Sequence, residues 1–185
     1  MKSLKGHLVI ATPQLEGPIF ARSVILMLDH GSDGAMGVIL NHPLDVVVTD
    51  LSGKIFEDEF VWDKNLLLGG PVTGPLMVLH TLEEMADQVV MPGVYCTLEA
   101  TKVQDILSRK VEPSLIVANY SGWGPDQLEG EFERDSWLTL PAQIEHIFRK
   151  DGDKDLWKDV VSAVNIQKLS EFLDIREFPS DPSLN

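Results

Sequence analysis

Polar residues that could bind an anion precede an apolar segment early in the chain. Arg22 and Ser23 come directly before the run Val24–Leu28, which has the continuous apolar character of a buried strand. A fixed guanidinium beside strand-end amides can bind a carboxylate or a phosphate. Arg22 could instead pair with Glu16 or Asp29 and only fix the entry of the chain into the strand. The sequence leaves both interpretations open.

Two histidines and an asparagine end other apolar segments, where a side chain can reach a cleft. His30 follows residues 23–29, His80 closes the run that begins at Leu76, and Asn41 follows a third run. A histidine at such a place suits a general base, and it equally suits a structural hydrogen bond to a nearby carbonyl. A shared site requires that the fold bring these residues together.

Glycine-rich segments follow two further apolar runs and complete the set of candidate positions. Loops at strand ends are where protein scaffolds present functional groups. A tryptophan between two glycines favours exposure, over a pocket or on a contact surface, while core packing stays the alternative. The glycine-rich candidates are Gly69, Gly70, Gly122, Trp123 and Gly124.

Signatures of well-known catalytic sites are absent from the sequence. There is no His-Glu-x-x-His helix, no phosphate-binding loop and no dinucleotide-binding turn. Tyr120-Ser121-Gly122 has the place of a nucleophile elbow, but Asn119 stands where that turn requires glycine. Cys96 is the only cysteine, which excludes an intrachain disulfide and a cysteine-rich metal site. We therefore expect no metal and no cofactor, and we assign no catalytic residue.

The charge balance limits the class of partner. The 185 residues include 15 Lys and Arg against 29 Asp and Glu, a net charge of −14. Such a chain repels phosphate backbones and anionic lipid surfaces, so direct nucleic-acid binding is not expected. No apolar stretch approaches the roughly 20 residues that cross a bilayer, and no export signal is recognisable. We expect a cytosolic protein that binds a protein partner or a small molecule.

Apolar periodicity and turn residues predict the elements that position these candidates. The runs 24–28 and 36–40 form a hairpin whose two faces are both covered, and residues 45–64 form a loop with one helical turn. One domain is expected over residues 1–178, with a loose tail at 179–185. Strands are expected at 6–11, 23–29, 35–40, 65–68, 76–80, 94–97, 114–120 and 137–140. Helices are expected at 98–110, at 125–134, from Pro141, and at 153–164.

Several strings in the sequence resemble the AlgH/YqgE family. They include Ile10-Ala11-Thr12-Pro13, Leu68-Gly69-Gly70-Pro71-Val72 and Gly122-Trp123-Gly124-Pro125-x-Gln127-Leu128-Glu129. The resemblance extends from about residue 6 to residue 164. It implies an α+β fold in which a bifurcated, mostly antiparallel sheet is curled into a pseudo-barrel with helices packed outside. It also implies the family's label of transcriptional regulator, which comes without an agreed activity.

Two positions depart from the family pattern. His42 stands where the family usually has Arg or Lys, and the loss of a permanent charge weakens a phosphate-binding role for that loop. Asn119 stands where the family usually has glycine before the tyrosine. Asparagine is the best substitute for glycine at positive φ, so a special backbone conformation is still possible there.

Three classes of function remain open. The leading one is a regulatory or adaptor protein that binds other proteins through the surface of the glycine-rich segments. The alternative is an enzyme or small-ligand binder in which Arg22, Ser23, His30, Asn41 and His80 converge with those segments on one cleft. Direct DNA binding follows only from the family label, because the sequence has no basic stripe and no helix-turn-helix pattern.

Overall fold

The computed structural model describes residues 2–56, 60–149 and 155–172. In this part of the chain ten strands form one sheet in the order β10-β1-β2-β3-β9-β6-β8-β7, with β4 and β5 joined to it through β9. The strands are β1 His7–Ala11, β2 Val24–Gly31, β3 Gly34–Ile39, β4 Pro43–Val47, β5 Asn65–Leu68, β6 Val72–His80, β7 Gln88–Met91, β8 Val94–Thr97, β9 Ser114–Trp123 and β10 Trp137–Pro141. The helices are η1 Val48–Leu51, η2 Glu83–Met85, α1 Ala100–Ser108, α2 Gln127–Glu133, α3 Ile144–Ile147 and α4 Leu156–Phe172.

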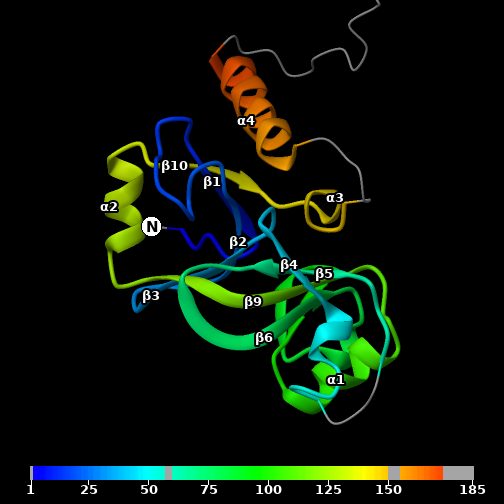
Figure 1. The fold of residues 1–185 in the computed structure, drawn as a ribbon. Helices are drawn as coiled ribbons and strands as arrows, with labels where there is room; N and C mark the ends of the chain where they lie inside the picture. The colour runs from blue at the N-terminus through cyan, green and yellow to red at the C-terminus, as the bar shows by residue number, and fades with distance from the viewer. Residues whose placement is uncertain (1, 57–59, 150–154, 173–185) are drawn as a thin grey trace, which may run out of the picture.

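The sheet bends around a central core and has a smaller core on each outer side. The central core lies inside the curl and includes the buried residues of α3 and α4. A second core lies between α1 and the strands β6 and β9, and a third lies between α2 and the strands β1, β2 and β3. Figure 1 shows α1, α2 and α4 on different sides of the bent sheet. The α+β fold with a curled, mostly antiparallel sheet and outer helices is therefore confirmed.

Strand β2 shows why the apolar runs are continuous. Val24, Leu26 and Leu28 point into the central core, while Ile25 and Met27 point into the core beneath α2. Successive side chains of a strand face opposite sides of the sheet, so a strand between two cores needs apolar residues at every position. The predicted β2–β3 hairpin with two covered faces is confirmed.

Strand β9 joins the two halves of the sheet. The C-terminal end of β9 pairs with β3, and most of the strand pairs with β6. Val117 and Ala118, near its middle, pair in parallel with β5. Asn119 interrupts the strand with a φ of 65°, the left-handed conformation considered from the sequence. The prediction of a loop after residue 120 was wrong, because Ser121 and Trp123 pair with Gly37 and Ala35.

Two strands were missed by the sequence reasoning. β4 pairs only with β5 and is mostly exposed, so it lacks an apolar pattern. β7 has four residues and pairs with β8 at the edge of the sheet. The helical turn expected within 45–64 is η1.

Helices α3 and α4 lie where two helices were predicted, but their lengths differ from the predicted ones. The helix expected from Pro141 is limited to the single turn α3, and α4 extends beyond the expected end at residue 164. The first residues of the helix predicted at 153–164, and the tail predicted at 179–185, lie outside the described residues. No helix in the described ranges is long and apolar enough to cross a membrane.

Candidate functional site

A left-handed turn places Arg22 at the start of β2. Its φ is 57°, which costs a non-glycine residue about 1–2 kcal/mol. Asn41 holds this turn with both ends of its amide. Its Nδ2 donates to the carbonyl oxygen of Arg22 at 2.8 Å, and its Oδ1 accepts from the amide of Val24 at 2.9 Å. Because strained backbone often marks functional sites, this turn is a candidate position.

The guanidinium of Arg22 contacts the first turn of α4. It lies 5.0 Å from the ring centroid of Trp157, and its Nη2 pairs with Oδ2 of Asp155. The pairing with Glu16 or Asp29 considered from the sequence is therefore replaced by one with Asp155. The side chain of Arg22 is 55% exposed, and its Nε and Nη1 have no partner among the described residues. Two guanidinium nitrogens thus stay available to a ligand.

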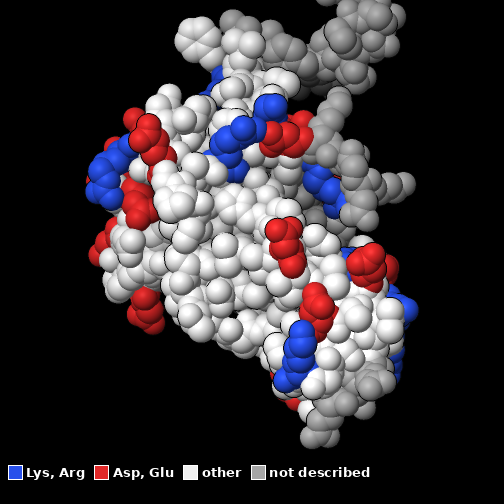
Figure 2. Space-filling model, viewed as in Figure 1, with Lys and Arg blue, Asp and Glu red and all other residues white. Residues whose placement is uncertain are grey.

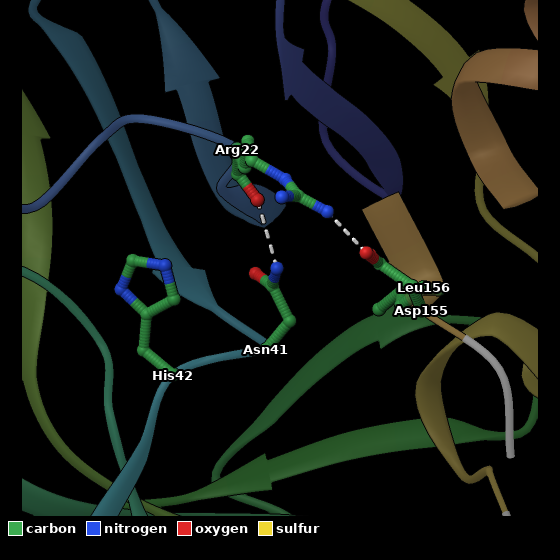
Figure 3. Close-up of a pocket in the computed structure, with 5 residues that line it drawn as sticks. All are labelled: Arg22, Asn41, His42, Asp155 and Leu156. Atoms are coloured by element: carbon green, nitrogen blue, oxygen red, sulfur yellow. Dashed lines mark hydrogen bonds and ion pairs between the residues drawn. The ribbon is translucent and has the colours of Figure 1, made fainter. Parts of the chain in front are cut away.

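Arg22 and Asn41 line one pocket of about 360 Å³ together with His42, Asp155 and Leu156. In Figure 3, Arg22, Asn41 and His42 surround the same hollow, and the two broken lines join Arg22 to Asn41 and to Asp155. Burial lowers the pKa of His42, which leaves its imidazole neutral at pH 7. We call these five residues the Arg22 pocket.

The charge of Asp155 is well stabilised in this pocket. Burial alone would raise the pKa of its carboxyl, but the amide of Lys158 and the charges of Arg22 and Lys158 lower that pKa below its ordinary value. The Nζ of Lys158 lies 3.7 Å from Oδ2 of Asp155. Two cations therefore flank one carboxylate.

A second candidate surface lies where β3, β6 and β9 meet. The ring of Tyr120 lies against two glycines, because a Cβ added at Gly74 would come within 2.7 Å of its Cδ1, and one at Gly122 within 3.2 Å of its Cε2. Val72 pairs with Tyr120 across the strands, and Met36 pairs with Gly122. The hydroxyl of Tyr120 has no hydrogen-bond partner within the part of the chain that the structure describes. We call these five residues the tyrosine face.

The tyrosine face belongs to three segments without charged residues. Residues 34–44, 65–82 and 113–125 contain no Asp, Glu, Lys or Arg, although the whole chain carries a net charge of −14. These segments supply β3, β5, β6 and β9, which adjoin one another in the sheet. Figure 2 shows a broad area without charged side chains over β3, β6 and β9, with charged groups at its margins.

Gly69 and Gly70 lie between β5 and β6, and their backbones contact β3 and β9. The carbonyl of Gly69 accepts from the amide of Ile39 at 3.0 Å, two residues before Asn41. Gly70 has a φ of 154°, and a Cβ there would come within 2.4 Å of the backbone of Tyr120 and Ser121. These glycines therefore allow close backbone packing beside both surfaces.

His30 lies apart from the Arg22 pocket and is held by its neighbours. Its Nδ1 accepts from the amide of Leu4 at 3.1 Å, so its Nε2 carries the proton and donates to Oε1 of Glu129 at 2.9 Å. It borders a separate pocket of about 440 Å³ with Ser3, Ser32 and Asp126 among its walls. Both ring nitrogens have structural partners.

His80 is the last residue of β6 and is fully buried. Its Nδ1 accepts from the amide of Leu82, and its Nε2 donates to Oγ1 of Thr97 at 2.7 Å, which in turn donates to the carbonyl of Met85. Burial lowers the pKa of His80, against the opposing charges of Glu84 and Asp87. Of the two roles considered from the sequence, His80 therefore has the structural hydrogen-bonding role.

Trp123 lies in the core beneath α2 instead of on a surface. It is 7% exposed, and its Nε1 donates to Oε2 of Glu131 at 2.9 Å. Gly124 is exposed, and its amide donates to Oε1 of Gln127. Ser23 is also fully buried, and its Oγ has no partner among the described residues.

The predicted residues therefore do not converge on one cleft. Arg22 and Asn41 share a pocket, whereas His30 and His80 lie elsewhere. Sequence reasoning selected neither His42 nor Tyr120, although His42 had been noted as a departure from the family pattern. No group of three or more His, Cys, Asp or Glu in the described ranges has the arrangement of a metal site. Burial raises the pKa of Cys96 to about 12, which leaves this thiol unreactive.

Comparison with known proteins places the chain in a family. Residues 8–169 match the AlgH-like family model. A UPF0301 protein of Chlamydia caviae is 34% identical over 163 residues, which cover 85% of this chain and 84% of that protein. A UPF0301 protein of Shewanella denitrificans is 36% identical over 164 residues, with coverages of 85% and 89%. The chain therefore belongs to the AlgH-like family.

Solved structures agree with this assignment. The solution structure of the AlgH protein from Pseudomonas aeruginosa is similar over 97% of both chains, with a TM-score of 0.73 and 26% sequence identity. The crystal structure of protein DIP2367 from Corynebacterium diphtheriae covers 85% of both chains, with a TM-score of 0.70 and 25% identity. The resemblance stated from the sequence is confirmed.

Proposed function

We propose that this protein is a cytosolic protein-interaction module with a regulatory role, and that it binds a partner protein through the tyrosine face. The observation that supports the proposal is the position of Tyr120. Its ring packs against Gly74 and Gly122, and its hydroxyl has no partner among the described residues. A rigid aromatic ring with a free polar group is typical of residues that dominate binding energy at protein interfaces.

The charges define the chemistry of the partner. The tyrosine face has no charged residue, while the molecule as a whole carries a net charge of −14. A matching partner presents an apolar centre surrounded by basic residues, because opposite potentials favour encounter. A second copy of this chain is disfavoured by repulsion between two strongly acidic molecules.

An enzyme built on the predicted polar residues has less support. His30 and His80 use both ring nitrogens in structural hydrogen bonds, and they lie apart from Arg22. A general base needs a free nitrogen within reach of its substrate. Binding without chemistry is therefore the favoured function for the tyrosine face.

The test compares two exposed valines that are replaced by the same acid. Val72 lies in the tyrosine face and is 37% exposed, whereas Val89 lies on β7 and is 52% exposed. Proteins from the source cells that bind the immobilised chain are purified. Their affinities for the wild type and for both variants are then measured by titration. We expect one such protein to bind Val72→Glu at least about tenfold more weakly than the wild type, and to bind Val89→Glu normally.

Three outcomes would contradict the proposal. One is that every retained protein binds Val72→Glu and Val89→Glu with the same affinity. Another is a dimer of this chain that only Val72→Glu dissociates, which would make a second copy the occupant of the face. The third is a submicromolar, salt-sensitive complex with duplex DNA, which would favour direct DNA binding.

A further inference from the structure

The Arg22 pocket has the features of a small-ligand site. Its volume of about 360 Å³ lies at the lower end of the range for ligand pockets, roughly 300–1,000 Å³. Asn41 fixes the backbone of Arg22, and the ring of Trp157 lies beneath the guanidinium. The binding group is therefore held in place before any ligand arrives, which lowers the entropic cost of binding.

The unused hydrogen-bonding groups of this pocket suit an oxyanion. Arg22 has Nε and Nη1 free among the described residues, and Asp155 contacts only Nη2. Each free nitrogen shares one planar edge of the guanidinium with Nη2, so the second N–H of Nη2 completes the pair of donors that a carboxylate accepts. His42 has no side-chain partner in the described part of the chain. As a neutral imidazole it offers one N–H donor and one acceptor.

The local charge favours a single negative charge. Among the described residues, Arg22 and Lys158 are positive and Asp155 is negative, which gives a balance of one positive charge. A monocarboxylate neutralises that charge. A phosphate dianion would leave excess negative charge in a molecule that already carries a net charge of −14.

We propose that the Arg22 pocket binds a small monocarboxylate, which accepts hydrogen bonds from one edge of the Arg22 guanidinium and from His42. Asp155 is the competing carboxylate, because it already occupies Nη2. The residues of this pocket are separate from those of the tyrosine face, so the failure of one proposal does not decide the other.

The experiment is a titration of the full chain, followed by the NMR signals of the Arg22 Nε–H and the Trp157 Nε1–H. Acetate, lactate and benzoate are compared with inorganic phosphate and chloride at constant ionic strength. We expect at least one carboxylate to shift both signals with a dissociation constant in the millimolar range or below, and to bind more tightly than phosphate.

Three variants assign the effect to the pocket. Arg22→Lys keeps the charge but loses the planar donors, and should weaken carboxylate binding by about tenfold. Arg109→Lys alters an exposed arginine that pairs with Asp105 on α1, and should leave binding unchanged. Asp155→Asn removes the competing charge and should tighten binding by about fivefold, a gain that misfolding cannot produce.

Several results would overturn the assignment. The carboxylates could leave both signals unshifted in the millimolar range, or Arg22→Lys could behave like Arg109→Lys. Tighter binding of phosphate than of every carboxylate would show a phosphate site instead. Unchanged or weaker binding by Asp155→Asn would contradict the role given to the local charge.

Discussion

At the scale of single residues, Glu131 on α2 organises the core beneath that helix. Its Oε2 accepts from the Nε1 atoms of both Trp123 and Trp137, and its Oε1 accepts from Gln127. The two indoles pack edge to face at a centroid distance of 6.2 Å. One carboxylate thus satisfies three donors, which explains why a tryptophan flanked by glycines can be a core residue.

Glu131→Gln should destabilise the protein by about 1–3 kcal/mol, because the amide oxygen that faces the two indoles carries no charge and the new amide nitrogen cannot accept from Gln127. Urea unfolding followed by tryptophan fluorescence measures the change. Glu133→Gln alters an exposed acid on the same helix and should stay within about 0.5 kcal/mol of the wild type. Equal stabilities of the two variants would contradict the role of Glu131.

The sequence predicted some candidate residues because their roles are local. Arg22 and Asn41 stand at strand ends, and both residues line the pocket. The role of Tyr120 could not be predicted, because the glycine that makes room for its ring, Gly74, lies on another strand. Burial of Trp123 could not be predicted either, since its partner Glu131 becomes adjacent only when α2 packs on the sheet.

At the scale of elements, α4 attaches to the sheet through its first turns. Leu156, Val160 and Val164 are buried in the central core, and Trp157 Nε1 donates to the carbonyl of Ala11 at 2.7 Å. The last turn is different, since Phe172 is 85% exposed. The helix is therefore held at its N-terminal half.

Trp157→Phe should increase hydrogen exchange of the α4 amides and leave the amides of β2 and β9 protected. The variant loses the bond to Ala11 and weakens the contact with Arg22, a local loss of about 1–2 kcal/mol. Hydrogen exchange resolved by residue measures the effect. Phe172→Ala is the control and should leave exchange unchanged, while equal loss of protection in α4 and the sheet would contradict local attachment.

Elements with strong apolar patterns were predicted well, and elements defined by pairing were not. β2 and β3 lie between two cores, so their apolar residues identify them from sequence alone. β4 exists because β5 lies beside it, and its exposed side chains carry no pattern. The end of β9 contains glycines that weaken any strand prediction, yet its pairing with β3 keeps it extended.

At the scale of the whole molecule, burial of several histidines links stability to pH. The pKa values of His42, His80 and His146 are all lowered from 6.5, with burial as the largest cause in each case. Below pH 6.5 the unfolded chain therefore binds more protons at these residues than the folded chain does. The contribution of these histidines should be constant above about pH 6.5, and stability should fall as the pH decreases from there toward the folded pKa values.

Urea unfolding at pH 7.5 and at pH 5.5 tests this linkage. The midpoint should be lower at pH 5.5, and His80→Gln should show a smaller difference between the two pH values than the wild type. Asp87 does not interfere, because its pKa of about 2 lies far below this range. Equal midpoints for the wild type at both pH values would contradict the assignment.

The pairing of the first strand with the last has a consequence for synthesis on the ribosome. β1 lies between β2 and β10, and His7 pairs with Pro141. At about 5–20 residues per second, β1 waits on the order of ten seconds for its second partner to be made. During that time the apolar runs of the nascent chain have no complete sheet to join, so chaperones that shield extended apolar segments should matter most before β10 emerges.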